Sequence, residues 1–178
     1  MKYKYLAVVG LILFLAGCQS SGDWENNTET GMPSVHEQRG ALVLYKKPLF
    51  NPGGGGGSFC DGLHDVAAGK DVPDMRNFLY YACEGRYTLT LSGNKGTTLS
   101  LFGKFNYQKE NGFMVIVKSD NQKLWVINLN SIPSGKWVSV EAGRQTGGYE
   151  VFFRKASGFD QSISSVKWGQ WWQGDTPE

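Results

Sequence analysis

An alternation of apolar and polar residues recurs along most of the chain, and it constrains the fold more than any other feature. Because successive side chains of a β-strand point to opposite faces, a period of two indicates strands with one buried face. Turn-forming residues separate the runs, as in Ser-Gly-Asn-Lys-Gly at 92–96. Short strands at this spacing predict an all-β sandwich or barrel. The runs cover residues 41–45, 78–83, 86–91, 98–105, 113–118, 123–129, 137–141, 149–154 and 163–168.

Other stretches predict loops or a short turn of helix within one domain, residues 40–173. Residues 61–69 are the stretch that best fits a helical turn. Residues 119–122 resemble the loop of a hairpin between the runs on either side. The five glycines at 53–57 predict a flexible loop, because no Gly-Lys-Ser/Thr follows them as a phosphate-binding loop requires.

The N-terminus differs from the rest of the chain. Lys2 and Lys4 lead into an apolar run at 6–16, and a basic start followed by a short apolar run is typical of a secretory signal peptide. A membrane-spanning helix needs roughly 20 apolar residues, which makes an uncleaved anchor the weaker alternative. The run closes in Leu-Ala-Gly-Cys at 15–18. This sequence resembles the lipobox of bacterial lipoprotein signal peptides.

The lipobox resemblance implies that residues 1–17 are removed and that Cys18 carries lipid on its sulfur and its amine. Two or more acyl chains hold a protein firmly at a membrane. Residues 18–39 are rich in Ser, Gly, Asn and Thr and predict a flexible tether, and residues 174–178 predict a short tail. Gln19 is not the Asp that retains enterobacterial lipoproteins in the inner membrane. The resemblance therefore implies the outer membrane, with the domain facing the periplasm.

The charge of the mature chain argues against nucleic acid as a partner. Removal of residues 1–17 takes Lys2 and Lys4 from the 18 basic residues and nothing from the 16 acidic ones, so the formal charge falls from +2 to zero. A neutral mature chain argues against nucleic acid as a partner, and it also argues against association with a membrane by net charge.

Lipid on Cys18 leaves two of the three cysteines, Cys60 and Cys83, as an even pair in an oxidising compartment. We expect a disulfide, which would stabilise the fold by ~3 kcal/mol. Two separate buried thiols are the alternative. Thiol titration of the unfolded mature protein distinguishes them, since two free thiols exclude the disulfide.

A second resemblance lies in the C-terminal half of the domain. It consists of Gly-Lys-Trp at 135–137, Val-Glu at 140–141, Gly-Gly-Tyr at 147–149 and Phe-Asp-Gln-Ser-Ile-Ser-Ser-Val at 159–166. These residues resemble a Greek-key motif of the βγ-crystallin family. Residues 41–51 resemble that family's other signature, a strand ending in Tyr before a turn with Pro and Phe. Two such motifs imply a Greek-key β-sandwich.

Calcium-binding members of that family use the loop Asn/Asp-Asn/Asp-x-x-Ser/Thr-Ser. Asp160, Ser164 and Ser165 fit it, but Gln161 stands at the second position, and its longer side chain weakens a site of hard oxygen ligands. One degenerate loop rarely supplies the roughly 6–8 oxygens that calcium takes. We therefore expect no cofactor, and we keep a calcium-binding structural module as an alternative.

A fainter resemblance is to periplasmic lipoprotein inhibitors of c-type lysozyme. It lies in Tyr-Ala-Cys-Glu-Gly-Arg at 81–86, before alternating strands. Of the inhibitory Ser-Gly loop and its following Tyr, the chain has Ser134 and Gly135, with Trp137 after them. The resemblance implies an inhibitor of lysozyme or of a similar lytic enzyme, which we keep as a second alternative.

Catalytic motifs are absent from the sequence. The two histidines are His36, in the tether, and His64. His64 with Asp65 could serve as a general base, although a surface pair in a turn is the simpler interpretation. Cys60 and Asp61 lie close to His64, but an oxidised cysteine is not a thiolate metal ligand. We expect a protein that is not an enzyme.

Three tryptophans, Trp168, Trp171 and Trp172, end the domain. They either cover the end of a sandwich or form an exposed platform for a glycan or a protein. The sequence as a whole predicts a lipid-anchored envelope protein whose β domain acts by binding a protein or glycan partner.

Overall fold

Nine β-strands and four short 3₁₀ turns form the regular structure in the computed structural model, which describes residues 41–47, 62–78, 81–82 and 85–177. This part of the chain contains no α-helix, and nothing in it is a helix long and apolar enough to cross a membrane. The strands are β1 Leu42–Lys47, β2 Gly62–Val66, β3 Arg86–Leu91, β4 Thr98–Phe102, β5 Phe113–Lys118, β6 Leu124–Val126, β7 Trp137–Val140, β8 Tyr149–Arg154 and β9 Ser165–Trp168. The 3₁₀ turns are η1 Met75–Asn77, η2 Phe105–Tyr107, η3 Leu129–Ser131 and η4 Phe159–Gln161.

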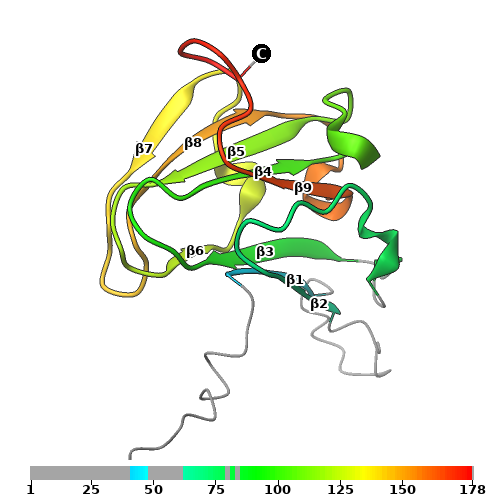
Figure 1. The fold of residues 1–178 in the computed structure, drawn as a ribbon, viewed down its shortest axis with the longest axis horizontal. Helices are drawn as coiled ribbons and strands as arrows, with labels where there is room; N and C mark the ends of the chain where they lie inside the picture. Colours follow the sequence, from blue (N-terminus) through cyan, green and yellow to red (C-terminus); the bar gives the residue numbers. More distant parts are fainter. Residues whose placement is uncertain (1–40, 48–61, 79–80, 83–84, 178) are drawn as a thin grey trace, which may run out of the picture. The chain divides into compact units, whose positions relative to one another are not determined.

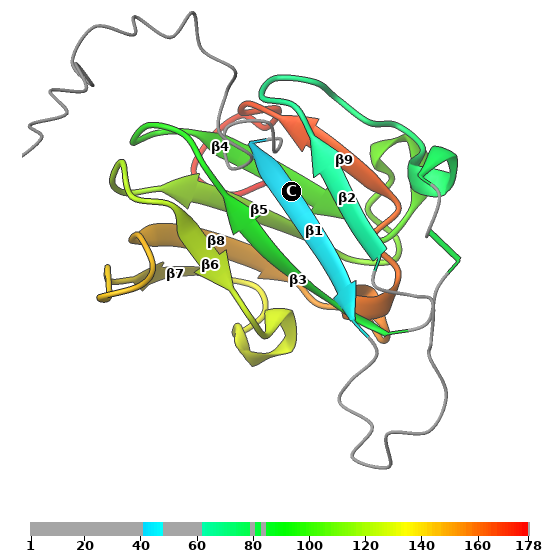
Figure 2. The ribbon, with the colours of Figure 1, turned by 90° about the horizontal axis from the view of Figure 1, so that it is seen from below.

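The strands form two antiparallel sheets that lie face to face (Figure 1). The four-stranded sheet has the order β2-β1-β3-β6, and the five-stranded sheet has the order β7-β8-β5-β4-β9. Figure 2 shows the four-stranded sheet in front of the other. The predicted β-sandwich is therefore confirmed, whereas its Greek-key, crystallin-like detail stays a prediction.

Apolar side chains from the facing sides of the two sheets form the main core. On β8, Val151 and Phe153 point into this core, whereas Glu150 and Arg154 lie on the outer face and are exposed. The alternation in the sequence is thus the alternation between core and outer face. The core includes Leu42, Leu44, Leu89, Leu91, Leu99, Leu101, Met114, Ile116, Val151, Phe153, Ile163 and Val166.

A second apolar layer covers the outer face of the five-stranded sheet. Phe113 and Val115 of β5 face away from the main core, yet both are fully buried. They are buried because the chain turns after β9 and residues 170–177 run back over this face (Figure 1). Trp137 donates a hydrogen bond from Nε1 to the carbonyl of Asp175 at 2.7 Å, which attaches the C-terminal segment to β7. The aromatic layer, as we call it, consists of Phe102, Phe113, Phe152, Trp137, Trp171 and Trp172.

One edge strand of each sheet, β9 and β6, is covered. Val72 forms an isolated β-bridge with Val166 of β9. On β6, the Thr146 hydroxyl accepts a hydrogen bond from Trp125 N at 2.8 Å, and Gly147 N donates to the Lys123 carbonyl at 3.0 Å. Covered edges do not recruit a further strand.

The strand register defines two ends of the sandwich. Leu42, at the start of β1, pairs with Leu91, which pairs in turn with Leu124. We call this the proximal end, because the chain enters the sandwich there. Hydrogen bonds, among them Lys95 N to Asn121 Oδ1 and Ser119 N to the Gly148 carbonyl, join its loops, 92–97, 119–123 and 141–148. The opposite, distal end carries loops 103–112 and 155–164.

Most predicted strands are confirmed, and residues 86–91, 113–118 and 149–154 form β3, β5 and β8 with the predicted bounds. The helical turn predicted at 61–69 is wrong, because β2 occupies Gly62–Val66 and pairs with β1.

The hairpin predicted around residues 119–122 is also wrong. β5 pairs with β4 and β8, whereas β6 pairs with β3 in the other sheet. In the predicted strand at 78–83, the described residues Phe78 and Tyr81 lie in turns. The described part of the chain does not include the three cysteines, Cys18, Cys60 and Cys83, or the rest of residues 1–40 and 48–61.

Candidate functional site

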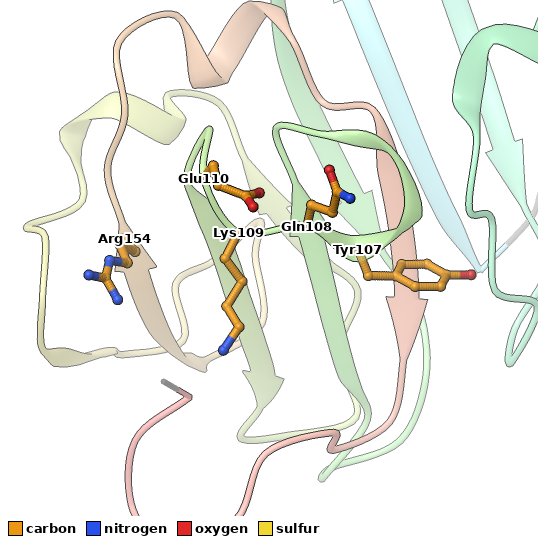
Figure 3. A pocket seen from close by; sticks show the side chains of 5 residues that line it. All are labelled: Tyr107, Gln108, Lys109, Glu110 and Arg154. Carbon is orange, nitrogen blue, oxygen red and sulfur yellow. The ribbon is translucent and has the colours of Figure 1, made fainter.

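A hollow of about 520 Å³ opens at the distal end (Figure 3). Tyr107, Gln108, Lys109 and Glu110 line it from the β4–β5 loop, and Arg154 lines it from the end of β8. Figure 3 shows the Lys109 and Arg154 side chains on the same side of this loop, away from the Tyr107 hydroxyl. The hollow thus combines two cations, one carboxylate, one amide and an aromatic ring.

The loop that forms the hollow is held in a strained conformation. Asn106 and Tyr107 both have positive φ angles, 54° and 59°, which are uncommon for residues other than glycine. Their backbone amides are fixed from outside the loop: Asn106 N donates to the Pro73 carbonyl at 2.8 Å, and Tyr107 N donates to Ser165 Oγ at 3.1 Å. Strain of this kind is often found at binding sites, and it sets the position of the Tyr107 ring.

The two cations of the hollow differ in their partners. The Lys109 amine lies over the Trp171 ring, 5.1 Å from its centroid. Glu110, the carboxylate of the hollow, forms an ion pair at 3.8 Å with Lys104, which does not line the hollow. Arg154 has no ion-pair or side-chain hydrogen-bond partner among the residues described here, and it is exposed. A guanidinium without a carboxylate partner is available to an anionic ligand.

The three tryptophans predicted as a platform or a cover lie in two different places. Trp168 packs against the main core, whereas Trp171 and Trp172 lie in the aromatic layer. Trp171 donates from Nε1 to Ser100 Oγ at 2.7 Å, and its ring lies 5.6 Å from that of Phe102. Both residues cover a sheet face rather than the end of the sandwich, and Trp171 joins this layer to the hollow through Lys109.

The weak calcium candidates contact other protein groups. Asp160 is buried and forms an ion pair with Arg86 at 3.2 Å. Ser165 Oγ donates to the Lys104 carbonyl at 2.7 Å, and Ser164 donates to the Ser162 carbonyl at 2.8 Å. In the described ranges, His, Cys, Asp and Glu form no group of three or more that could hold a metal ion.

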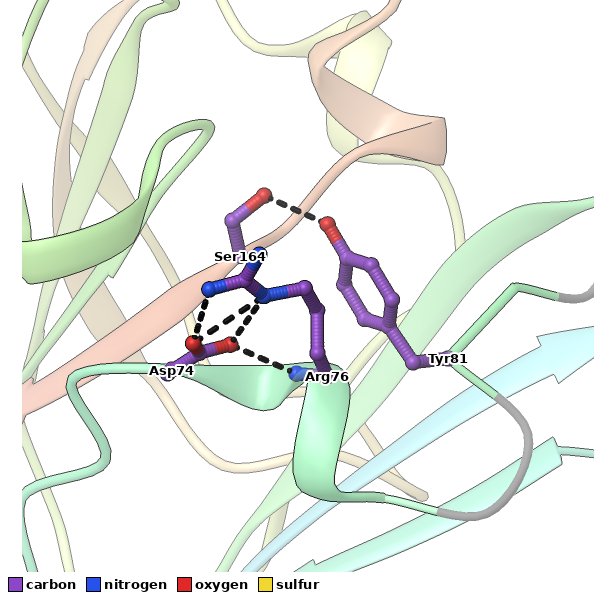
Figure 4. A network of polar contacts seen from close by, with 4 residues as sticks. All are labelled: Asp74, Arg76, Tyr81 and Ser164. Atoms are coloured by element: carbon purple, nitrogen blue, oxygen red, sulfur yellow. Dashed lines mark hydrogen bonds and ion pairs between the residues drawn. The ribbon is translucent and has the colours of Figure 1, made fainter.

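Ser164 also belongs to a polar network at the distal end (Figure 4). Its hydroxyl lies 2.9 Å from the Tyr81 hydroxyl. Nearby, Arg76 donates from Nε to Asp74 at 3.0 Å and lies over the Phe105 ring at 4.3 Å. Hydrogen bonds from Arg76 lower the pKa of the Asp74 carboxyl. Met75 N donates to the Ser164 carbonyl at 2.9 Å, so η1 is attached to the residue before β9 and the role of these contacts is structural.

The predicted acid–base pair is not brought together. His64 and Asp65 follow each other on β2, so their side chains point to opposite faces: His64 is fully buried and Asp65 is exposed. Burial, and secondarily the Lys46 charge, lower the pKa of His64 to about 4. Its ring packs against Phe78 and Tyr87, at 5.2 and 5.8 Å between centroids. The surface pair expected in a turn is therefore wrong for His64.

Ser134, Gly135 and Trp137, the positions of the inhibitor resemblance, lie beside β8 at the distal end. Ser134 Oγ accepts a hydrogen bond from Lys155 N at 2.9 Å, and Gly135 N donates to the Phe153 carbonyl at 2.8 Å. Trp137 belongs to the aromatic layer. All three have structural contacts, and Ser134 and Gly135 are exposed.

Sequence reasoning missed the hollow itself. Residues 107–110 read as an ordinary polar loop, and Arg154 reads as the outward residue of a strand. The sequence gives no signal of the positive φ angles at Asn106 and Tyr107, because neither residue is a glycine. Comparison with protein-family models, with curated proteins and with solved structures gave no significant match to this chain.

Proposed function

We propose that this chain is a lipid-anchored protein of the bacterial outer membrane that acts by binding, and that the distal hollow holds its ligand. Support for the anchor is the lipobox at 15–18 and the polar segment that follows it. Support for binding is the hollow, which contains Arg154, without a partner among the described residues, and the Lys109 amine, which lies over the Trp171 ring. Small-ligand sites combine apolar walls with a few polar groups in this way.

The chemistry of the hollow fits a saccharide that carries carboxylates. Arg154 and Lys109 can pair with carboxylates, the Gln108 amide offers both a donor and an acceptor to hydroxyl groups, and the Tyr107 ring offers an apolar face. The observation that carries the proposal is the pairing of a free guanidinium with a preset, strained loop in one hollow. Envelope polysaccharides and muropeptides belong to this ligand class.

The side chains that line the hollow favour binding over catalysis. Glu110 is paired with Lys104, and the His64 ring is buried away from the hollow. His64 is therefore too far inside the protein to act on a ligand beside Arg154, and Glu110 lines the hollow without a second carboxylate or a histidine among the described lining residues to complete an acid–base pair. We therefore propose a function without a chemical step.

Titration of the mature protein with acidic oligosaccharides and with muropeptides tests this function. We expect saturable binding that the Arg154→Gln substitution weakens about tenfold, the loss of one charge-assisted contact of about 1.4 kcal/mol. Lys155→Gln is the matched control, because Lys155 is also exposed at the distal end but does not line the hollow. Equal weakening by both substitutions, or no binding to either ligand, would contradict the proposal. Tight binding of a c-type lysozyme instead would favour the inhibitor alternative.

A further inference from the structure

Trp125 and Ile127 are large apolar side chains without cover. In the described part of the chain they are the exposed large hydrophobic residues, with 51% and 74% of their surfaces accessible. Leu124 and Val126 alternate with them and are buried in the core. Trp125 therefore lies on the outer face of the four-stranded sheet, opposite Thr90. Exposed large apolar side chains that lie close together can mark an interaction site.

This surface is not suited to pairing with another strand. The backbone of Trp125 already contacts the Thr146 hydroxyl, and the Lys123 carbonyl accepts from Gly147. The edge of β6 is therefore occupied, and what it offers a partner is side chains. A peptide that adds a strand is excluded as the occupant.

Trp125 lies close to the point where the chain enters the sandwich. Leu42, the second described residue, shares one row of the sheet with Leu91 and Leu124. Strands in a sheet are roughly 4.8 Å apart, so β6 lies about 10 Å from the start of β1. The segment that would carry lipid at Cys18 thus joins the domain beside Trp125.

Exposed cations surround this surface at the proximal end. Lys123 precedes β6, and Lys95 and Arg144 lie in the two loops joined to it. Glu141 is the exposed acid of these loops, and Glu150 lies on the outer face of the other sheet. Asp120 is occupied by backbone amides, since Gly148 N and Gln122 N donate to it at 2.7 and 2.9 Å. The exposed loops thus carry more positive than negative charge.

We infer that Trp125 and Ile127, with Lys95, Lys123 and Arg144, form a membrane-facing surface that rests on the bilayer holding the lipid anchor. Tryptophan is favoured at the boundary between headgroups and acyl chains, and lysine and arginine are attracted to anionic headgroups. A lipid at Cys18 makes this contact intramolecular, so two apolar side chains suffice where they would not hold a free protein. The inference rests on the anchor of the proposed function, and it directs the distal hollow away from the membrane.

Fluorescence quenching in vesicles tests the inference. The lipidated protein is reconstituted into vesicles of phosphatidylethanolamine and phosphatidylglycerol with brominated acyl chains. We expect the bromine to quench Trp125, so that wild-type protein loses more emission than the Trp125→Phe variant. Ile127→Ser combined with Lys123→Gln should abolish this difference, whereas Lys155→Gln at the distal end should preserve it. The titration with saccharides, repeated in the same vesicles, should be unaffected by the Ile127 and Lys123 substitutions.

Each of the other possible outcomes contradicts a stated part of the account. Equal quenching of wild-type protein and the Trp125→Phe variant overturns the membrane-facing surface while leaving saccharide binding untouched. Self-association that Trp125→Ser abolishes identifies a second copy as the occupant and also overturns the inference. Absence of lipid on Cys18, measured by mass spectrometry, overturns the surface together with the proposed anchor. Lost saccharide binding with intact quenching would contradict the proposed ligand site alone.

Discussion

At the scale of single residues, His64 has the most unusual environment of the described titratable groups. Among the described residues, neither buried ring nitrogen has a hydrogen-bond partner, and neither does the nearby Tyr87 hydroxyl. Lys46 lies 4.9 Å from the Tyr87 ring centroid and donates to the Tyr81 carbonyl at 3.1 Å. Burial lowers the pKa of Lys46 and raises that of Tyr87. A protonated His64 beside this lysine is therefore strongly disfavoured.

The first residue-scale prediction concerns pH. The folded pKa of His64, about 4, lies below the ordinary histidine value of 6.5, so the unfolded chain binds the proton first as the pH falls. Stability is complete above about pH 6.5, and it decreases by about 3 kcal/mol by pH 4. Urea denaturation at both pH values should show a smaller decrease for His64→Leu than for wild type. Identical decreases would mean that carboxylates alone cause the acid sensitivity.

At the scale of elements, the C-terminal segment after β9 is what makes β5 buried on both faces. Trp171 contacts Phe102 and Phe113, at 5.6 and 5.7 Å between ring centroids, and Trp172 contacts Trp137 at 6.0 Å. These contacts favour the structural interpretation of the two tryptophans. The segment acts as a cover for the sheet rather than as a free tail.

Replacement of Trp171 by Ala should therefore lower the free energy of unfolding by about 2 kcal/mol, less than for a fully buried aromatic because Trp171 is half-buried. Trp125→Ala is the control: that side chain is more exposed, at 51%, and has no ring contact with the described aromatic residues, so we expect a smaller loss of about 1 kcal/mol. Denaturant unfolding of both variants measures the difference. If Trp171→Ala proves as mild as Trp125→Ala but abolishes ligand binding, the platform interpretation is correct.

The elements also show how much of the fold could be predicted from the sequence. β3, β5 and β8 were predictable because their alternation is regular. β2 was missed because Asp65 and the glycines around it weaken the pattern, although His64 and Val66 both face the core. A loop such as 119–122 looks the same in sequence whether it joins paired strands or crosses between sheets. The hollow depends on Arg154 meeting a loop about forty residues earlier in the chain, and no local pattern encodes that contact.

At the scale of the whole domain, the two proposed surfaces lie at different ends of the sandwich. The chain enters at the proximal end beside Trp125, and the hollow with Arg154 opens at the distal end. Strands of five or six residues separate these ends, a distance of roughly 17–20 Å. An anchor at one end and a ligand site at the other suit a protein that holds an envelope polymer at a distance from the membrane.

The central claim is that the distal hollow is the site that meets the ligand in the cell. Site-specific photo-crosslinking tests it most directly, with the photoreactive residue placed at Gln108 in the hollow or at Asn94, which is equally exposed at the proximal end. We predict that position 108 captures a carboxylate-bearing saccharide, identified by mass spectrometry, and that Arg154→Gln reduces the yield, while position 94 captures none. Equal capture at both positions, or capture at position 94 alone, would contradict the account.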